Sequence, residues 1–396
     1  MLWWKEIALL KQENKTLQNE LEKEQGKASR LAGFFARLLA FGVSPTGQIP
    51  RRAFAETLMD TVHALLNVEQ ALLLEMDPET LELVPASARG VSPQSLTRLR
   101  VRPGEGPLGK AAQGTKTVLH NGPLLEGASD FMSSTSLIVP LLSQAYCVGL
   151  LVAAKPQAGA FSPEDRSNLS LLAAQAALII EDHSLYEDLS RTKEQTVEAL
   201  ARALEAKDAY SHQHSGRLRA LGRAVAQELV LPEILITQIE DGALLHDVGK
   251  IGIADAILKK PSGLTPEEET IMKTHSAIGR SILDSIPSLR AVSSIVLYHQ
   301  EWYNGSGYPE GLAGEEIPLG ARVVQILDAW DAMTSDRIYR KAMPKTAAIA
   351  ELRRQAGSQF DPKLVDLFLR VQDRLEREGI PTTEQPGEQS LASQRA

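Results

Sequence analysis

Apolar residues near the start of the chain recur at alternating spacings of three and four over residues 5–31. This spacing predicts a helix with a narrow apolar stripe, as in the seam of a coiled coil. Asn14 occupies a seam position, where a buried amide can select a two-stranded partner, and Glu24 interrupts the stripe. We expect residues 1–32 to form a coiled coil in a homodimer; the alternative is a helix packed on its own neighbouring domain. The seam residues are Ile7, Leu10, Asn14, Leu17, Leu21, Ala28 and Leu31.

Residues 33–185 mix helical and strand periodicities. The strings ALLLEM and LELVPAS, joined by a turn at Asp77-Pro78-Glu79-Thr80, predict a β-hairpin. Further strands are expected at KTVLH, SLIVPLL and CVGLLVAA. Ser162, followed by a proline and two acids, predicts a helix start.

The pattern over residues 190–375 is almost wholly helical. A connecting helix over 186–210 is expected to join the two domains, and the polar tail 376–396 predicts disorder. The expected fold class is therefore multidomain α+β. An antiparallel sheet with flanking helices precedes an all-α domain, with coiled-coil helices at the amino terminus and in the linker.

The composition is that of a soluble globular protein, with 43% hydrophobic and 23% charged residues. A net charge of -8 argues against broad nucleic-acid binding. One cysteine, Cys147, excludes an internal disulfide framework and a zinc site built from several thiolates. Charged residues break the apolar start of the chain, and no later apolar run reaches the roughly 20 residues of a membrane span. A cytoplasmic location is expected.

Five of the eight histidines lie between residues 212 and 299. Gly249 is expected to close the helix that ends at the adjacent pair His246 and Asp247. His275 is expected on the helix whose capping box starts at Thr265. Residues gathered in this way in the core of a helical bundle can bind metal.

Asp328 and Asp331 lie three residues apart on an otherwise apolar predicted helix, so both are expected to project into the interior. A lone core histidine is usually structural, but a buried carboxylate needs a partner. One shared metal centre accounts for all of these groups together. Its candidate ligands are His214, His246, Asp247, His275, His299 and Asp328.

Imidazoles and carboxylates without thiolates suit iron, manganese or zinc. Two such ions would offer a bridging hydroxide as nucleophile and hold a phosphate oxygen for in-line attack. This chemistry predicts hydrolysis of a phosphodiester or a phosphomonoester. Lys250 is placed to neutralise charge on the phosphate; the alternative is a surface lysine at a helix end.

The strings GPLGKAAQGTKTV, SLIVPLLSQAYCVGLLVAA and FSPEDRSNLSLLAAQAALI resemble a GAF sensor domain over residues 33–185. They describe a fold rather than a ligand, because the Asn-Lys-Phe-Asp-Glu signature of cyclic-nucleotide-binding members is not visible. An unknown small molecule or signal is the expected GAF partner. Cys147 is interpreted as a core thiol.

The strings HDVGKIGIADAILKKPSGLTPEE, KTHSAIG, HQEWYNGSGYPEGLAGEEIPLGAR and DAWDAMTSDRIYRKAM resemble the HD-GYP phosphodiesterase family. The match covers about 190–350, within a domain expected over 190–375. The resemblance implies hydrolysis of cyclic di-GMP to the linear dinucleotide pGpG, and further to GMP in some members. It also implies non-haem iron or manganese as a pair of divalent ions, and diguanylate cyclase-type proteins as candidate partners.

Carried over residue by residue, the six candidate ligands fall on the family's metal positions, with Asp247 expected to bridge. Lys250 matches a lysine that faces the phosphate, and Tyr308, Arg337 and Arg340 match positions that contact the dinucleotide. A planar arginine can clamp a phosphate with two hydrogen bonds, and a tyrosine can stack on guanine.

Three departures from the family pattern bear on activity. Gln300 stands where a second consecutive histidine is usual, so it is an additional candidate ligand, through a weaker carbonyl oxygen. Tyr210 replaces a glutamate of trinuclear members, which favours two metals. Arg340 stands where some members have lysine. The alternatives left open are a cyclic di-GMP receptor without efficient turnover, which Gln300 favours, and a hydrolase of another nucleotide.

Overall fold

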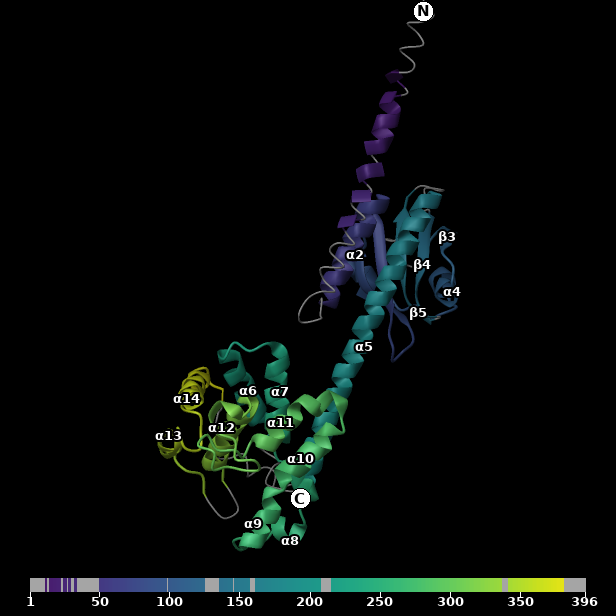
Figure 1. Cartoon of the computed structure of the whole chain (residues 1–396). Helices are drawn as coiled ribbons and strands as arrows, with labels where there is room; N and C mark the ends of the chain where they lie inside the picture. Colours follow the sequence, from purple (N-terminus) through teal and green to yellow (C-terminus); the bar gives the residue numbers. More distant parts are fainter. Residues whose placement is uncertain are drawn as a thin grey trace, which may run out of the picture. The chain divides into compact units, whose positions relative to one another are not determined.

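The computed structural model of the chain contains two compact units, Met1–Asp188 and Leu189–Ala396 (Figure 1). The first unit contains a sheet, whereas the second unit is helical. The structure describes residues 11–12, 14–22, 24–26, 28–29, 32–33, 50–97, 99–124, 135–144, 146–156, 161–207, 215–336 and 341–380.

The first unit is built on a five-stranded antiparallel sheet with the strand order β2-β1-β5-β4-β3. Because side chains alternate across a strand, Leu73 faces the helices α2 and α5, and Leu72 faces α4. Both faces are therefore covered by apolar side chains. The elements are α2 (Arg51–Leu66), β1 (Gln70–Met76), β2 (Leu83–Arg89), α3 (Pro93–Thr97), α4 (Gly106–Gln113), β3 (Val118–Asn121), β4 (Thr135–Ser143), β5 (Tyr146–Lys155) and α5 (Pro163–Lys207).

Local sequence signals explain how these elements begin and turn. The predicted hairpin is confirmed: Asp77 Oδ1 accepts hydrogen bonds from the backbone N–H groups of Glu79 and Thr80, at 2.9 and 3.0 Å, in the turn between β1 and β2. At the start of α5, the Asp165 N–H donates to Ser162 Oγ and the Ser162 N–H donates to Asp165 Oδ2. The predicted helix start is therefore confirmed as well.

Cys147 lies on β5 and packs partly buried against the core beside α4. Burial raises the pKa of its thiol, although the Sγ also donates to the Gly149 carbonyl oxygen. A raised pKa keeps the thiol protonated and unreactive. This environment agrees with a structural thiol.

The described residues 14–22 are helical, and Leu17 and Leu21 on the predicted seam are 60% and 59% exposed. In the single chain, the side chains of Leu17 and Leu21 are therefore exposed to solvent. Ile7, Leu10 and Leu31 lie outside the described residues, and the pairing of this helix with a second copy stays a prediction.

The second unit packs helices around Trp330, which is fully buried and meets Phe368 edge to face at 5.4 Å between ring centroids. Its elements are the last part of α5, α6 (Ser215–Glu228), α7 (Glu233–Leu245), η2 (Val248–Gly252), α8 (Asp255–Leu258), α9 (Pro266–Lys273), α10 (His275–Asp284), η3 (Pro287–Leu289), α11 (Arg290–Tyr298), η4 (Gly314–Glu316), α12 (Leu319–Thr334), α13 (Lys345–Gln355) and α14 (Pro362–Arg377).

A smaller core in this unit joins α5 to the segment that carries the His246-Asp247 pair. Val197 of α5 belongs to one buried cluster with Leu245 and Val248, which flank that pair on both sides in the sequence. The packing of α5 therefore supports the backbone on which the candidate site is built.

Two expected helix boundaries need correction. The capping box of Thr265 and Glu268 is present, but the helix that it starts, α9, ends at Lys273, and His275 opens the next helix. Gly249 does not close α7, which ends at Leu245; it lies inside the short helix η2. In the part of the chain that the structure describes, no helix has the length and apolar character needed to cross a bilayer.

Candidate metal centre

Three of the candidate histidines lie just after the end of a helix. His246 directly follows α7, His299 directly follows α11, and His275 lies two residues after the last residue of α9. The last carbonyl groups of a helix lack partners within the helix, and each histidine ring bonds to one of them through Nδ1. The Nδ1···O distances are 2.9 Å for His246 to Ala243, 2.8 Å for His275 to Met272 and 2.7 Å for His299 to Val296.

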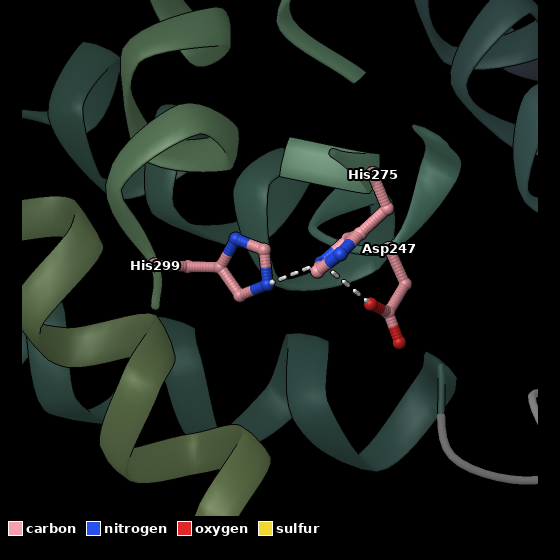
Figure 2. A group of neighbouring side chains, drawn as sticks. All are labelled: Asp247, His275 and His299. Carbon is pink, nitrogen blue, oxygen red and sulfur yellow. Dashed lines mark hydrogen bonds and ion pairs between the residues drawn. The ribbon is translucent and has the colours of Figure 1, made fainter. Parts of the chain in front are cut away.

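These backbone contacts determine which ring nitrogen is available to a ligand. In a neutral imidazole one nitrogen donates and the other accepts, so an Nδ1–H that donates to a carbonyl leaves a lone pair on Nε2. The Nε2 atoms of His275 and His299 lie 3.4 Å apart (Figure 2). Burial lowers the pKa of both rings, which favours their neutral form. Two neutral rings in this tautomer present two lone pairs to each other, and a cation between them relieves the conflict.

Asp247 supplies the negative charge at this position. Its Oδ1 lies 3.5 Å from the Nε2 of His275, and its Oδ2 lies 3.4 Å from the Nε2 of His246 and 2.6 Å from the Nζ of Lys250. Burial alone would raise the pKa of this carboxyl, but Lys250 and His246 beside it hold the pKa well below its usual value. Asp247 is therefore an ionised carboxylate whose two oxygens face different histidines.

His246 lies between two carboxylates. Its Nε2 is 3.8 Å from Asp328 Oδ1, on the side of the ring that also faces Asp247. Burial lowers the pKa of this imidazole, but Asp247 and then Asp328 more than offset that effect and raise it to about 9. A bound divalent ion would replace this proton, so metal binding would release it.

The residues present fit a metal ion. The ligand atoms of Asp247, His275 and His299 all lie within 4.8 Å of one another, and both histidines are almost fully buried. Imidazole nitrogens that are oriented by backbone carbonyls, together with an ionised carboxylate, form a typical donor set for a catalytic metal. His246, which faces both Asp247 and Asp328, extends this set.

Close backbone packing holds the ligands together. A Cβ atom on Gly249 would fall 1.8 Å from the carbonyl oxygen of His275 and 2.5 Å from the backbone nitrogen of Gly279. Only glycine allows η2 to approach the start of α10 this closely. This approach brings Asp247 within reach of His275.

The two aspartates of α12 have different surroundings. Asp328 faces His246, whereas Asp331 is buried and its Oδ1 accepts a hydrogen bond from Arg217 of α6 at 3.0 Å. The Oγ of Ser335 also donates to Asp331. The expectation that both aspartates project into the interior needs correction, because the side chain of Asp328 is 33% exposed.

This difference predicts two separate effects of substitution. Asp331→Asn is expected to lower the free energy of unfolding of the metal-free protein by about 3 kcal/mol, the cost of breaking a buried ion pair, with little change in metal affinity. Asp328→Asn is expected to weaken metal binding and leave the stability of the metal-free protein nearly unchanged. Denaturant unfolding after chelation and metal titration measure the two quantities. Equal effects of both variants on metal affinity would contradict this assignment.

Tyr308 lies on the loop between α11 and α12, residues 299–318, which we call the α11–α12 loop. Its ring is half-buried, 6.3 Å from the His275 ring, and the Lys273 Nζ lies 5.5 Å from its centroid. Burial, then Asp247 and Asp328, raise the pKa of the phenol above its ordinary value, so Tyr308 remains protonated. An aromatic face and a cation are thus placed beside the metal ligands.

Several sequence-predicted residues cannot be placed. His214, Tyr210, Arg337 and Arg340 lie outside the described residues. The backbone oxygen of Gln300 accepts a hydrogen bond from the Tyr308 N–H at 3.2 Å, which links this position to the α11–α12 loop.

Two residues near the site were missed by the reasoning from sequence. Lys273 carried no signal, because a lysine at a helix end is ordinary. Glu301 is 1% exposed and binds the backbone of the α11–α12 loop. The signal in the sequence was the position of Glu301 two residues after His299, which helical periodicity does not reveal.

Comparison with known proteins agrees with this arrangement. Residues 198–364 match the model of the HD domain, and residues 49–181 match the model of the GAF domain. Both expected domain resemblances are confirmed.

Three relatives are similar to about half of the chain. A cyclic di-GMP phosphodiesterase response regulator, RpfG, from Xanthomonas campestris is 40% identical over 51% of this chain and 55% of its own length. A cyclic di-GMP phosphodiesterase from Thermotoga maritima is 39% identical over 46% of this chain and 50% of its own length. A 3'3'-cGAMP-specific phosphodiesterase from Vibrio cholerae is 34% identical over 52% of this chain and 40% of its own length. The chain spans about half the length of the relatives it matches.

Proposed function

We propose that this chain, in which a GAF domain precedes an HD domain, is a metal-dependent phosphodiesterase that hydrolyses cyclic di-GMP. The observation that carries the proposal is the Asp247 carboxylate, whose two oxygens face two different groups of ligands. The activity named for relatives that are 39–40% identical supports the substrate. Cyclic di-GMP is a dianion, and Lys250 and Lys273 provide positive charge beside the ligands.

Two divalent ions are proposed, one for each of two groups of candidate ligands. One group consists of His275, His299 and Asp247 Oδ1, and the other consists of His246, Asp328 and Asp247 Oδ2. His214 is proposed as a further ligand. Nitrogen and oxygen donors without thiolates favour iron or manganese. When bound, the ions supply Lewis-acid chemistry that activates water and polarises the phosphodiester.

The side chains of the chain bind and orient the substrate. Lys250, which pairs with Asp247 in the described structure, is proposed to contact the phosphate and neutralise the charge that develops on it. Tyr308 is proposed to stack on a guanine, and Arg337 and Arg340 to bind the dinucleotide. The proposed product is linear pGpG, with further cleavage to GMP as a second step.

A receptor that binds cyclic di-GMP without efficient turnover is the second candidate function. The observation that favours it is Gln300, whose amide oxygen is a weaker ligand than an imidazole nitrogen. Either function is compatible with a homodimer through the amino-terminal helix, where Leu17 and Leu21 are exposed. Diguanylate cyclase-type proteins remain proposed partners.

Turnover of cyclic di-GMP by protein that is purified anaerobically and loaded with iron or manganese tests the proposal. Chromatography is expected to show pGpG, and chelation to abolish its formation. If the protein bound metal and cyclic di-GMP but formed no product, the proposed enzymatic activity would be wrong and the receptor function would replace it. Faster cleavage of 3'3'-cGAMP than of cyclic di-GMP would make 3'3'-cGAMP the substrate. One relative is named as a phosphodiesterase specific for that dinucleotide.

The GAF domain is proposed to regulate the site through α5. One face of this helix, from Leu169 to Ile180, belongs to the sheet-packed core of the first unit. Further along α5, Lys193 Nζ lies 2.6 Å from Asp241 Oδ2 of α7, and Lys207 Nζ lies 2.6 Å from Asp255 Oδ1 of α8. Asp241 lies before His246 and Asp255 lies after Asp247 in the chain, and Val197 packs in one cluster with Leu245 and Val248. A change in the position of α5 would therefore act on the backbone on both sides of His246 and Asp247.

This regulation predicts an effect of replacing the Lys193–Asp241 pair by apolar residues. Lys193→Met combined with Asp241→Leu removes the charges without leaving one of them unpaired, a replacement that is often neutral for stability. The turnover rate of the full chain is expected to change by at least about fivefold, the lower range of coupling between sites. The matched control is Arg377→Met with Asp373→Leu, an exposed pair on α14. An unchanged rate in the first variant would exclude this connection.

A further inference from the structure

Glu301 is a buried carboxyl group beside the metal ligands but outside the ligand set. It is 1% exposed and follows His299 by two residues. Its Oε1 accepts hydrogen bonds from the backbone N–H groups of Glu310 and Gly311, at 2.7 and 2.9 Å. Among the described residues, Oε2 has no hydrogen-bond partner. Burying a carboxyl with one unsatisfied oxygen is unfavourable, so the contacts of Oε1 must be important to the local structure.

These contacts close the α11–α12 loop on both sides of Tyr308. On one side, the Tyr308 N–H donates to the Gln300 carbonyl oxygen at 3.2 Å. On the other side, the N–H groups of Glu310 and Gly311 bind Glu301. The backbone of residues 308–311 is thus held against residues 300–301.

Close packing at Gly307 strengthens this arrangement. A Cβ atom there would fall 2.2 Å from the backbone nitrogen of Trp302 and 2.5 Å from the Cα of Glu301. The backbone oxygen of Glu301 accepts a hydrogen bond from Gln325 of α12, the helix that also carries Asp328. Glu301 therefore joins the end of α11, the Tyr308 segment and α12.

The position of the Tyr308 ring depends on this junction. The ring is near the His275 ring and the Lys273 ammonium, but no hydrogen bond from its hydroxyl is present among the described contacts. The backbone is consequently the main element that orients the ring. Loss of the Glu301 contacts would remove the backbone anchors of residues 310 and 311. The exposed hydrogen bond from the Tyr298 hydroxyl to the Glu310 side chain would remain, and the looser backbone would allow the Tyr308 ring to move.

We propose that Glu301 is a positioning residue that sets the affinity for the dinucleotide by holding Tyr308 beside the metal ligands. This inference rests on the proposed function, since it concerns recognition of the same substrate. It assigns to Glu301 no contact with substrate or metal. Both hydrogen bonds go to one oxygen, so an amide oxygen at this position would accept both of them.

Three variants of Glu301 distinguish the effect of its hydrogen bonds from the effects of its charge and its side-chain volume. Glu301→Met removes the acceptor and keeps the volume, whereas Glu301→Gln keeps an acceptor and removes the charge. Glu301→Asp keeps the charge but is one methylene too short, and it serves if the methionine variant does not fold. Glu315→Met is the matched control, because it makes the same change at an exposed glutamate of the same loop.

The measurements are KM and kcat for cyclic di-GMP, metal content, hydrolysis of bis(p-nitrophenyl) phosphate and hydrogen exchange of the Glu310 and Gly311 amides. Glu301→Met is expected to raise the KM for cyclic di-GMP roughly 10- to 100-fold, as for loss of hydrogen bonds to a charged group. Exchange of the two amides is expected to become faster. Metal content and hydrolysis of the small diester, which has no guanine, are expected to stay the same. Glu301→Gln and Glu315→Met are expected to resemble the parent.

Each other outcome overturns the inference in an identifiable way. Equal losses with cyclic di-GMP and the small diester, or loss of metal, would mean that Glu301 acts through the metal ligands. A parental KM in Glu301→Met, with slow exchange of both amides, would show that the loop does not need this residue. If the parent protein neither binds nor cleaves cyclic di-GMP, the proposed function fails first, and the parent's own data distinguish that case from failure of the Glu301 role.

Discussion

Asp247→Asn is expected to abolish turnover of cyclic di-GMP and to lower the metal content of the protein. The neutral amide removes the charge that His246 and His275 face, and it replaces one carboxylate oxygen by an N–H donor directed at an imidazole. Removing a residue that hydrogen-bonds to a metal ligand typically lowers metal affinity or activity roughly 10- to 100-fold. Removing a ligand that bridges two ions is expected to lower both by more than that. Elemental analysis and product chromatography measure both effects.

The control for this prediction is Asp284→Asn. Asp284 is an exposed carboxylate at the end of α10 that accepts a hydrogen bond from Ser293, away from the ligands. This variant removes the same charge from the second unit and is expected to retain metal and turnover. If Asp247→Asn kept both metal ions and the parental rate, the bridging role of Asp247 would be wrong.

Gly249→Ala is expected to disrupt the metal centre without changing any ligand. The added Cβ would fall 1.8 Å from the His275 carbonyl oxygen; the backbone fixes the position of the Cβ and the oxygen is itself a backbone atom, so neither can rotate away. The segments that carry Asp247 and His275 must therefore separate. Overpacking of this kind costs about 1–3 kcal/mol or more in unfolding free energy, and we expect weaker metal binding as well.

Gly263→Ala is the matched control for the glycine variant. Gly263 lies in the same unit, before α9, and an added Cβ meets nothing within 4 Å. Its stability is expected to change by no more than about 0.5 kcal/mol, as for an ordinary surface substitution. Parental metal affinity in Gly249→Ala would show that the close approach of η2 to α10 does not position the ligands.

Much of the fold followed from local signals. The strings ALLLEM and LELVPAS and the Asp77 turn between them identified β1 and β2; β1 carries a continuous apolar run because the sheet is covered on both faces. The Thr265 capping box correctly marked the start of α9. The end of that helix was misjudged, because the apolar period continues into α10 although the backbone ends one helix at Lys273 and begins another at His275.

The candidate site was predictable in its residue types more than in its contacts. The spacing of His246, His275 and His299 identified groups that do meet. Helical phase alone could not separate Asp328 from Asp331, since residues three apart share a face. The difference arises from Arg217 on α6, which is more than one hundred residues away in the chain and binds only Asp331 of the two.

The sequence by itself determined the two-domain order, most helices and strands, and the histidines and carboxylates that are candidate metal ligands. These properties depend on side-chain type and on spacing within one element, which can be read directly from the chain. Only the tertiary structure decided that Asp247 directs its two oxygens at different histidines, that Gly249 admits the His275 backbone, and that Glu301 holds the Tyr308 segment. Each of these depends on distances between separate elements, which packing sets and local periodicity does not encode.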